Sequence, residues 1–86
     1  MELKDTVELM LSEDFKDRFK AEYWQTKIRC DRLHKMIVNY EAGKLNFEPK
    51  CSLELLTNQV GVMKHYLFIL EVRAAIEGVE LDEKGD

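Results

Sequence analysis

The chain has 86 residues, a formal net charge of −4 at pH 7 and a hydrophobic content of 45%. This length allows one domain, and the acidic balance disfavours nonspecific binding of nucleic acid. The two cysteines lack the spacing of a disulfide scaffold, residues 1–6 lack the features of a signal peptide, and no apolar run could span a bilayer. We therefore expect a protein of a reducing cytoplasm that has no membrane partner.

The first predicted element is a short amphipathic helix within an N-terminal extension, residues 1–12. Leu3, Val7 and Met10 recur at spacings of four and three, and Leu11 adds a further apolar position. Such spacings place apolar side chains on one face of a helix. We expect this helix to fold over one end of the domain.

A long helix is predicted for residues 13–42. Ser12 is a suitable N-cap residue, and the acids Glu13 and Asp14 suit the positive end of the helix dipole. The helix carries an apolar stripe with the heptad spacings 4-3-4-3-4-3, formed by Phe19, Tyr23, Thr26, Cys30, Leu33, Ile37 and Tyr40. Gly43 follows as a residue suited to ending a helix.

A second long helix is predicted for residues 53–77, after a break that contains the only proline, Pro49. Ser52 is suited to cap its start, and Gly78 follows its end. Its apolar stripe has the complementary spacings 3-4-3-4-3-4 and is formed by Leu53, Leu56, Val60, Met63, Leu67, Leu70 and Ala74. The rhythm therefore matches that of the first helix.

Two matched stripes joined by a short connection predict an all-α antiparallel two-helix hairpin over residues 13–77. An acidic tail, residues 78–86, follows it. The register that aligns the stripes pairs Cys30 with Leu67, Leu33 with Met63, and Thr26 with Leu70.

The second helix is apolar nearly all round, and a single partner helix cannot bury such a surface. On the first helix, Trp24 and Ile28 lie opposite the stripe. Either the N-terminal helix covers them, or Trp24 is simply exposed, or a second copy packs there. A large apolar patch on a small protein is typical of an interface, so we predict a homo-oligomer. The predicted interface residues are Trp24, Ile28, Val62, Phe68, Ile69, Val72 and Ile76.

Several packing positions resemble those of a known family. The second helix reads Leu55-Leu56-x-x-Gln59-x-x-x-Met63-x-x-Tyr66-x-x-Ile69-Leu70-x-x-Arg73, and the first contains Arg32-Leu33-x-x-Met36-Ile37. Over residues 15–77 the chain resembles a family of small proteins of tailed bacteriophages and prophages, first labelled from an open reading frame of a crAss-like phage. The resemblance implies a two-helix hairpin with no assigned enzymatic activity. It also implies an accessory protein in a phage-infected bacterium, where such proteins often inhibit host factors or neutralise defence systems. The chain departs from the family pattern by its N-terminal residues 1–14 and by a basic segment, residues 16–35.

Catalysis and metal binding have little support in the sequence. Cys30 and His34 share a helix face, whereas Cys51 and His65 lie beyond the break, and their spacing matches no zinc pattern. Cys30 falls in the apolar stripe, where a free thiol acts as a small hydrophobe. No glycine-rich phosphate loop or nucleophile turn accompanies the Cys–His pair. We therefore predict no enzyme, no metal site and no cofactor.

One flank of the predicted hairpin gathers cations, an amide and an aromatic ring. Helical wheels at 100° per residue place six side chains on this side: Arg18, Arg29, Arg32, Gln59, Tyr66 and Arg73. Guanidinium groups bind phosphate oxygens, and a tyrosine ring can stack on a base, so the flank is a candidate binding site for a nucleotide or a partner. In the alternative interpretation, Arg73 pairs with Glu22 and Tyr66 packs in an interface.

These patterns and the resemblance together predict a non-enzymatic phage-type accessory protein of the host bacterial cytoplasm. It would bind, and so inhibit or sequester, a host component. Its partners would be further copies of itself and either a small anionic nucleotide, such as a cyclic nucleotide messenger, or a host protein. Two alternatives stay open. One is a phage structural or assembly factor, and the other is a small nucleic-acid-binding regulator, which the net charge disfavours.

Overall fold

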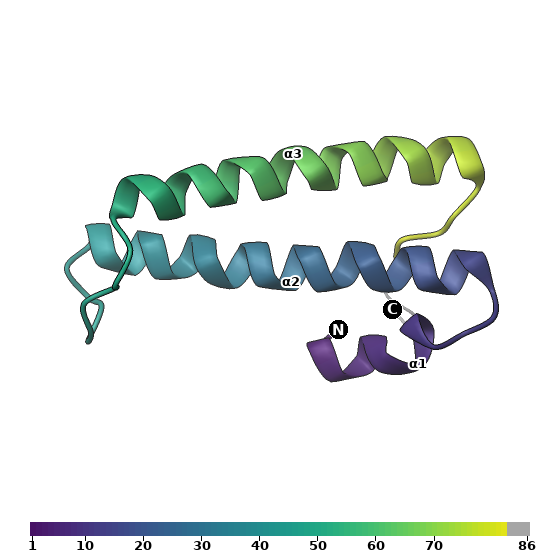
Figure 1. Cartoon of the computed structure of the whole chain (residues 1–86), viewed down its shortest axis with the longest axis horizontal. Coiled ribbons are helices and arrows are strands. Elements are labelled where there is room, and N and C mark those ends of the chain that lie inside the picture. Colours follow the sequence, from purple (N-terminus) through teal and green to yellow (C-terminus); the bar gives the residue numbers. More distant parts are fainter. Residues whose placement is uncertain (83–86) are drawn as a thin grey trace.

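The computed structural model describes residues 1–82, and every regular element among them is helical (Figure 1). The elements are the 3-10 helix η1 (Leu3–Thr6) and the α-helices α1 (Val7–Met10), α2 (Phe15–Glu41) and α3 (Leu53–Glu77). The prediction of an all-α protein is confirmed.

The α2 helix begins at Phe15 because Asp14, and not Ser12, caps it. The Asp14 Oδ1 atom accepts a hydrogen bond from the Lys16 backbone N–H at 2.9 Å. The Ser12 hydroxyl instead accepts from the Asp14 N–H at 3.0 Å and donates to Asp17 Oδ2 at 2.8 Å. The predicted N-cap is therefore wrong, because the carboxylate nearer the helix competes successfully for its first N–H groups.

Both ends of α3 agree with the prediction of residues 53–77. The Ser52 hydroxyl accepts a hydrogen bond from the Leu55 N–H at 3.1 Å. At the other end, Gly78 adopts a left-handed φ of 72°, and its N–H bonds to the Ala74 carbonyl. Glycine takes this conformation without a Cβ penalty, so the stop signal is local to the sequence.

The helices α2 and α3 lie side by side and run in opposite directions (Figure 1). The side chains between them form one core that draws on both predicted stripes. Its buried members are Phe19, Tyr23, Cys30, Val60, Leu67, Leu70, Ala74 and Val79. Leu33, Ile37 and Met63 pack against this core and are half-buried.

A hydrogen bond across the helix pair marks its register. The Tyr23 hydroxyl donates to Glu71 Oε2 at 2.9 Å. The expected pairing of Thr26 with Leu70 places Tyr23 opposite Arg73, two residues beyond Glu71 on the same helix. Burial, and then the bond to Glu71, raise the pKa of Tyr23 to about 12. The phenol therefore stays protonated at neutral pH and keeps donating across the pair.

Residues 1–12, here called the N-terminal unit, pack on the side of α2 that faces away from α3 (Figure 1). Thr6 is only 1% exposed. Its hydroxyl donates to the Leu3 carbonyl at 2.7 Å and accepts from Gln25 Nε2 at 2.9 Å. Ala21 of α2 is also fully buried, and its small side chain allows a close approach. Gln25 therefore serves to dock the N-terminal unit.

The chain after α3 turns back onto α2, and residues 79–81 form a strap (Figure 1). Val79 is 8% exposed, and Leu81 packs half-buried against the core. The Trp24 indole N–H donates to the Leu81 carbonyl at 2.8 Å. The strap thus covers Trp24. No local sequence pattern predicts this contact, because it joins residues 57 positions apart. Residues 83–86 of the predicted acidic tail lie outside the described residues.

Val79→Asp is expected to detach the strap and to lower the free energy of unfolding by about 2–3 kcal/mol. The substitution removes a buried valine, worth about 1.5–3 kcal/mol, and places an unpaired carboxylate on apolar surface. Trp24 is the only tryptophan, so its fluorescence emission should shift to longer wavelength. Urea denaturation followed by fluorescence measures both effects, and Glu80→Gln, at an exposed neighbour, is the control. Unchanged emission and an unchanged midpoint in Val79→Asp would show that the strap does not hold.

A candidate anion-binding flank

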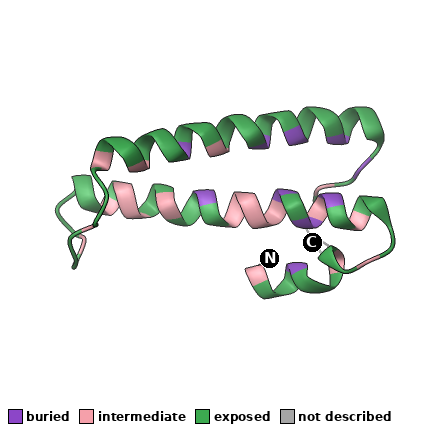
Figure 2. Ribbon diagram, in the orientation of Figure 1, coloured by how far each residue is buried: buried purple, intermediate pink, exposed green. Residues whose placement is uncertain are grey.

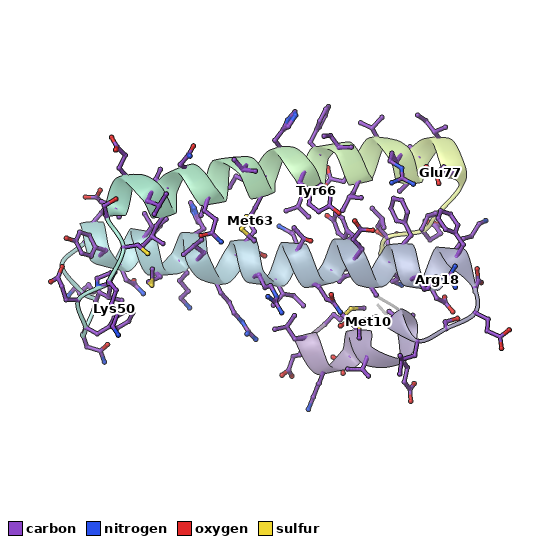
Figure 3. All side chains as sticks on the ribbon, viewed as in Figure 1. Met10, Arg18, Lys50, Met63, Tyr66 and Glu77 are labelled. Carbon is purple, nitrogen blue, oxygen red and sulfur yellow. The ribbon has the colours of Figure 1, made fainter. Side chains whose placement is uncertain are left out.

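The six residues of the predicted binding flank do not converge on one point. Arg18 and Arg32 are separated along α2 by about 21 Å, at 1.5 Å per residue. One group lies towards the middle of the helix pair, and the other lies at the end where α2 begins. Figure 3 shows Arg18 at that end and Met63 between the helices, closer to the middle.

Arg29, Arg32 and Gln59 lie together around a shallow depression of about 530 Å³ between α2 and α3. Apolar side chains complete its lining: Leu33, Met36 and Met63. Leu33 and Met63 also pack against the hydrophobic core, so the core holds the apolar side of the depression in place. Apolar surface with a few convergent polar groups is typical of a small-molecule site.

Neither Arg29 nor Arg32 makes a hydrogen bond or an ion pair within residues 1–82. Neither arginine has an ion pair within α2 because no acidic residue lies one helical turn before or after it. Elsewhere on α2 such a pair does form, between Lys27 Nζ and Asp31 Oδ1 at 3.2 Å. Both guanidinium groups are exposed, so their charges are open to an external anion.

Arg73, by contrast, already has its anion. It makes two hydrogen bonds to the Glu77 carboxylate, at 2.8 and 3.3 Å, and its Cζ lies 4.9 Å from the centre of the Phe19 ring. The bond to Glu77 raises the pKa of Arg73 above its ordinary value. The alternative pairing of Arg73 with Glu22 is wrong, because a carboxylate one turn along the same helix is nearer.

Arg18 and Tyr66 also lie apart from the depression. The Arg18 guanidinium donates to the Ser12 carbonyl at 2.8 Å, which ties the start of α2 to the N-terminal unit. Tyr66 is 38% exposed and stands about 10 Å beyond Gln59 along α3 (Figure 3). The structure therefore brings together three of the six predicted residues and leaves the other three elsewhere.

The predicted interface residues on α3 belong to an exposed apolar face. Figure 2 shows that the side of α3 facing away from α2 is exposed along its length. The large apolar side chains exposed on this helix are Leu55, Val62, Tyr66, Phe68, Ile69, Val72 and Ile76. The exposed fraction reaches 63% for Val62 and 78% for Ile76. Trp24 and Ile28 of α2, the other two predicted interface residues, are half-buried within the chain.

The thiol and imidazole groups stay apart from one another. Cys30 is buried in the core, whereas Cys51 and His34 are exposed. The His65 ring stacks on Phe68, with 6.5 Å between the ring centres. In the part of the chain that the structure describes, no three His, Cys, Asp or Glu side chains are placed to hold a metal ion.

Another hollow, of about 620 Å³, lies between the N-terminal unit and α2. Its lining residues are Met1, Asp5, Glu8, Leu9, Ser12, Asp17 and Lys20. Three carboxylates against one side-chain ammonium make this hollow unfavourable for a phosphate group. An anionic ligand is therefore better matched to the depression beside Arg29 and Arg32.

The sequence prediction missed the apolar lining of the depression. Leu33 and Met63 fall in the core stripes, and a stripe residue is ordinarily assigned to packing alone. Met36 carried a usable signal, because it follows Arg29 by seven residues and so lies only about 20° away on the same helix face.

Comparisons with known proteins identify a family. A family model described as Sequestin matches residues 13–76, which include all of α2 and all but the last residue of α3. This range nearly coincides with residues 15–77, the range of the resemblance described from the sequence. No curated protein and no solved structure matches the chain. Among residues 1–82, no helix is long and apolar enough to cross a membrane.

Proposed function

The chain belongs to the Sequestin family, and on this premise we propose that it sequesters a partner by binding it, without catalysing a reaction. The family name is compatible with such a role. The observation that carries the proposal is the depression lined by Arg29, Arg32 and Gln59, where neither guanidinium group has an anionic partner among residues 1–82.

The chemistry of the depression favours a small nucleotide as the sequestered partner. Two guanidinium groups three residues apart can each engage phosphate oxygens through paired N–H groups. The thioethers of Met36 and Met63 are soft, adaptable surfaces on which a base can rest, and the Gln59 amide can both donate and accept hydrogen bonds. A cyclic nucleotide messenger combines phosphates with bases in one small molecule and would use all of these groups.

Assembly of several copies is the second part of the proposal. The depression is shallow and open, so one copy alone would leave most of a nucleotide in water. A second copy packed nearby would enclose the ligand and add contacts, which strengthens charge-assisted bonds by excluding water. The exposed apolar face of α3 supports self-association, because large patches of this kind are typical of interfaces.

The biological setting follows from the resemblance to phage proteins. In the cytoplasm of an infected bacterium, a protein that holds a nucleotide messenger would keep it from the host's defence effectors. The chain would thus act as a counter-defence protein without enzymatic activity.

A host protein is the second candidate partner, favoured by the exposed apolar face of α3 within an acidic chain. A phage structural or assembly factor would use the same face. A nucleic-acid regulator would instead use the basic side chains of α2, and its binding would weaken steeply as the salt concentration rises.

Calorimetric titration of the purified protein with cyclic dinucleotides and with short oligonucleotides tests the proposal. We expect saturable binding of a cyclic dinucleotide, with a stoichiometry below one ligand per chain if copies share a site. Binding of oligonucleotides alone, with a steep salt dependence, would favour the regulator. Binding of neither would exclude the nucleotide proposal, and recovery of one stoichiometric host protein from an infected-cell lysate would then support the second candidate.

A further inference from the structure

The helix α3 carries a second heptad pattern that α2 does not use. Apolar residues recur every seven positions on the exposed side: Leu55, Val62, Ile69 and Ile76. Asn58, His65 and Val72 lie three residues after Leu55, Val62 and Ile69, respectively. We call these seven residues the outer seam. Its spacing is that of the a and d positions of a coiled coil, and it runs for about 31 Å at 1.5 Å per residue.

The outer seam holds no Asp, Glu, Lys or Arg, although 35% of the chain is charged. All seven residues are exposed in the single chain. The centres of protein interfaces are depleted of charged side chains, whereas ordinary solvent-facing helix surfaces are rich in them. This composition points to a protein partner whose own surface is apolar and arranged as a helix.

The outer seam itself has that character, so it is suited to pack against a copy of itself. Its four apolar a-type residues are evenly spaced about a midpoint between Val62 and Ile69. Reversing the direction of the helix therefore exchanges these four residues with one another, so that each meets an apolar residue across a two-fold interface.

The charges near the two ends of α3 set the direction of pairing. Glu77, Glu80 and Asp82 make the C-terminal end acidic, although Arg73 neutralises Glu77. Near the N-terminal end, charges of both signs are balanced, with Lys44 and Lys50 against Glu48 and Glu54. Parallel pairing would place two acidic ends together, whereas antiparallel pairing separates them and aligns the helix dipoles favourably.

We propose that the outer seam packs against the outer seam of a second copy, with the two α3 helices antiparallel and a two-fold axis near His65. The inference rests on the self-association that the proposed function includes and adds the surface and the direction by which copies meet. Ligand-free protein suffices to test it, so its failure and the failure of nucleotide binding are separate results.

Cysteine cross-linking measures the direction directly. The background variant is Cys51→Ser, because Cys51 is exposed while Cys30 is buried in the core. His65→Cys, at the middle of the seam, is expected to give mostly covalent dimer under mild oxidation. Leu55→Cys and Ile76→Cys, at the two ends, should stay monomeric separately and form dimer only when the two variants are mixed.

Thr57→Cys is the control, because Thr57 is exposed on α3 but outside the outer seam. Circular dichroism establishes that each variant keeps its helices. Self-linking of both end variants would show parallel pairing and overturn the proposal. Dimer formation by His65→Cys no greater than that of Thr57→Cys would show that the outer seam is not where copies meet.

Discussion

Leu70→Asp is expected to remove most of the stability of the fold. Leu70 is 1% exposed and lies in the core between α2 and α3. Truncating a buried leucine destabilises a protein by about 2–5 kcal/mol, and a buried carboxylate without a cation adds a desolvation penalty. A chain of this size has a free energy of unfolding of about 4–13 kcal/mol in total. Far-UV circular dichroism during heating should therefore show little or no cooperative unfolding transition for this variant.

The control for this experiment is Thr57→Asp, which introduces the same carboxylate at an exposed position of the same helix. Its free energy of unfolding should stay within about 0.5 kcal/mol of the wild type. If Leu70→Asp melted at the same temperature as Thr57→Asp, the helix pairing described above would be incorrect.

The helices could be predicted because their signals are local. The bounds of α3 follow from the Ser52 hydroxyl and the left-handed Gly78, each of which acts on backbone groups within a turn. The start of α2 is harder to predict from the sequence, because Ser12 and Asp14 are both good capping residues and only their geometry decides between them. The cover of Trp24 by the strap could not be predicted, because it depends on where the chain goes 57 residues later.

The candidate site could be predicted only in part, for a geometric reason. A helical wheel gives the angle of a residue about its helix but discards its position along the axis. It therefore grouped Arg18 with Arg32, although they are about 21 Å apart. The spacing of Arg73 and Glu77, four residues apart on one helix, was a local signal for the ion pair that removes Arg73 from the site. The absence of such a neighbour for Arg29 was equally readable in the sequence.

Charge reversal at the depression is the second change with a large expected effect. Arg29→Glu combined with Arg32→Glu should weaken binding of a cyclic dinucleotide more than 100-fold in calorimetric titration. Each charge-assisted hydrogen bond to a phosphate is worth about 1.5–3 kcal/mol, or about 10- to 150-fold in affinity, and each introduced carboxylate repels the ligand. Arg29→Lys should lose less, about tenfold, because the charge remains while the paired N–H geometry is lost.

The matched control is Lys35→Glu, which reverses a charge at an exposed position three residues beyond Arg32 on α2 but outside the lining of the depression. A general electrostatic attraction would make all three positions contribute alike, and raising the salt concentration would reduce the effect of each charge reversal. If the ligand binds specifically in the depression, Lys35→Glu should change the affinity by less than about threefold. The double variant should lose binding while keeping its helix content. Equal losses in the control and the double variant would show that phosphate is attracted to α2 as a whole. Retained binding in the double variant would place the ligand elsewhere on the molecule, because no nucleotide phosphate could stay beside two carboxylates in place of two guanidinium groups.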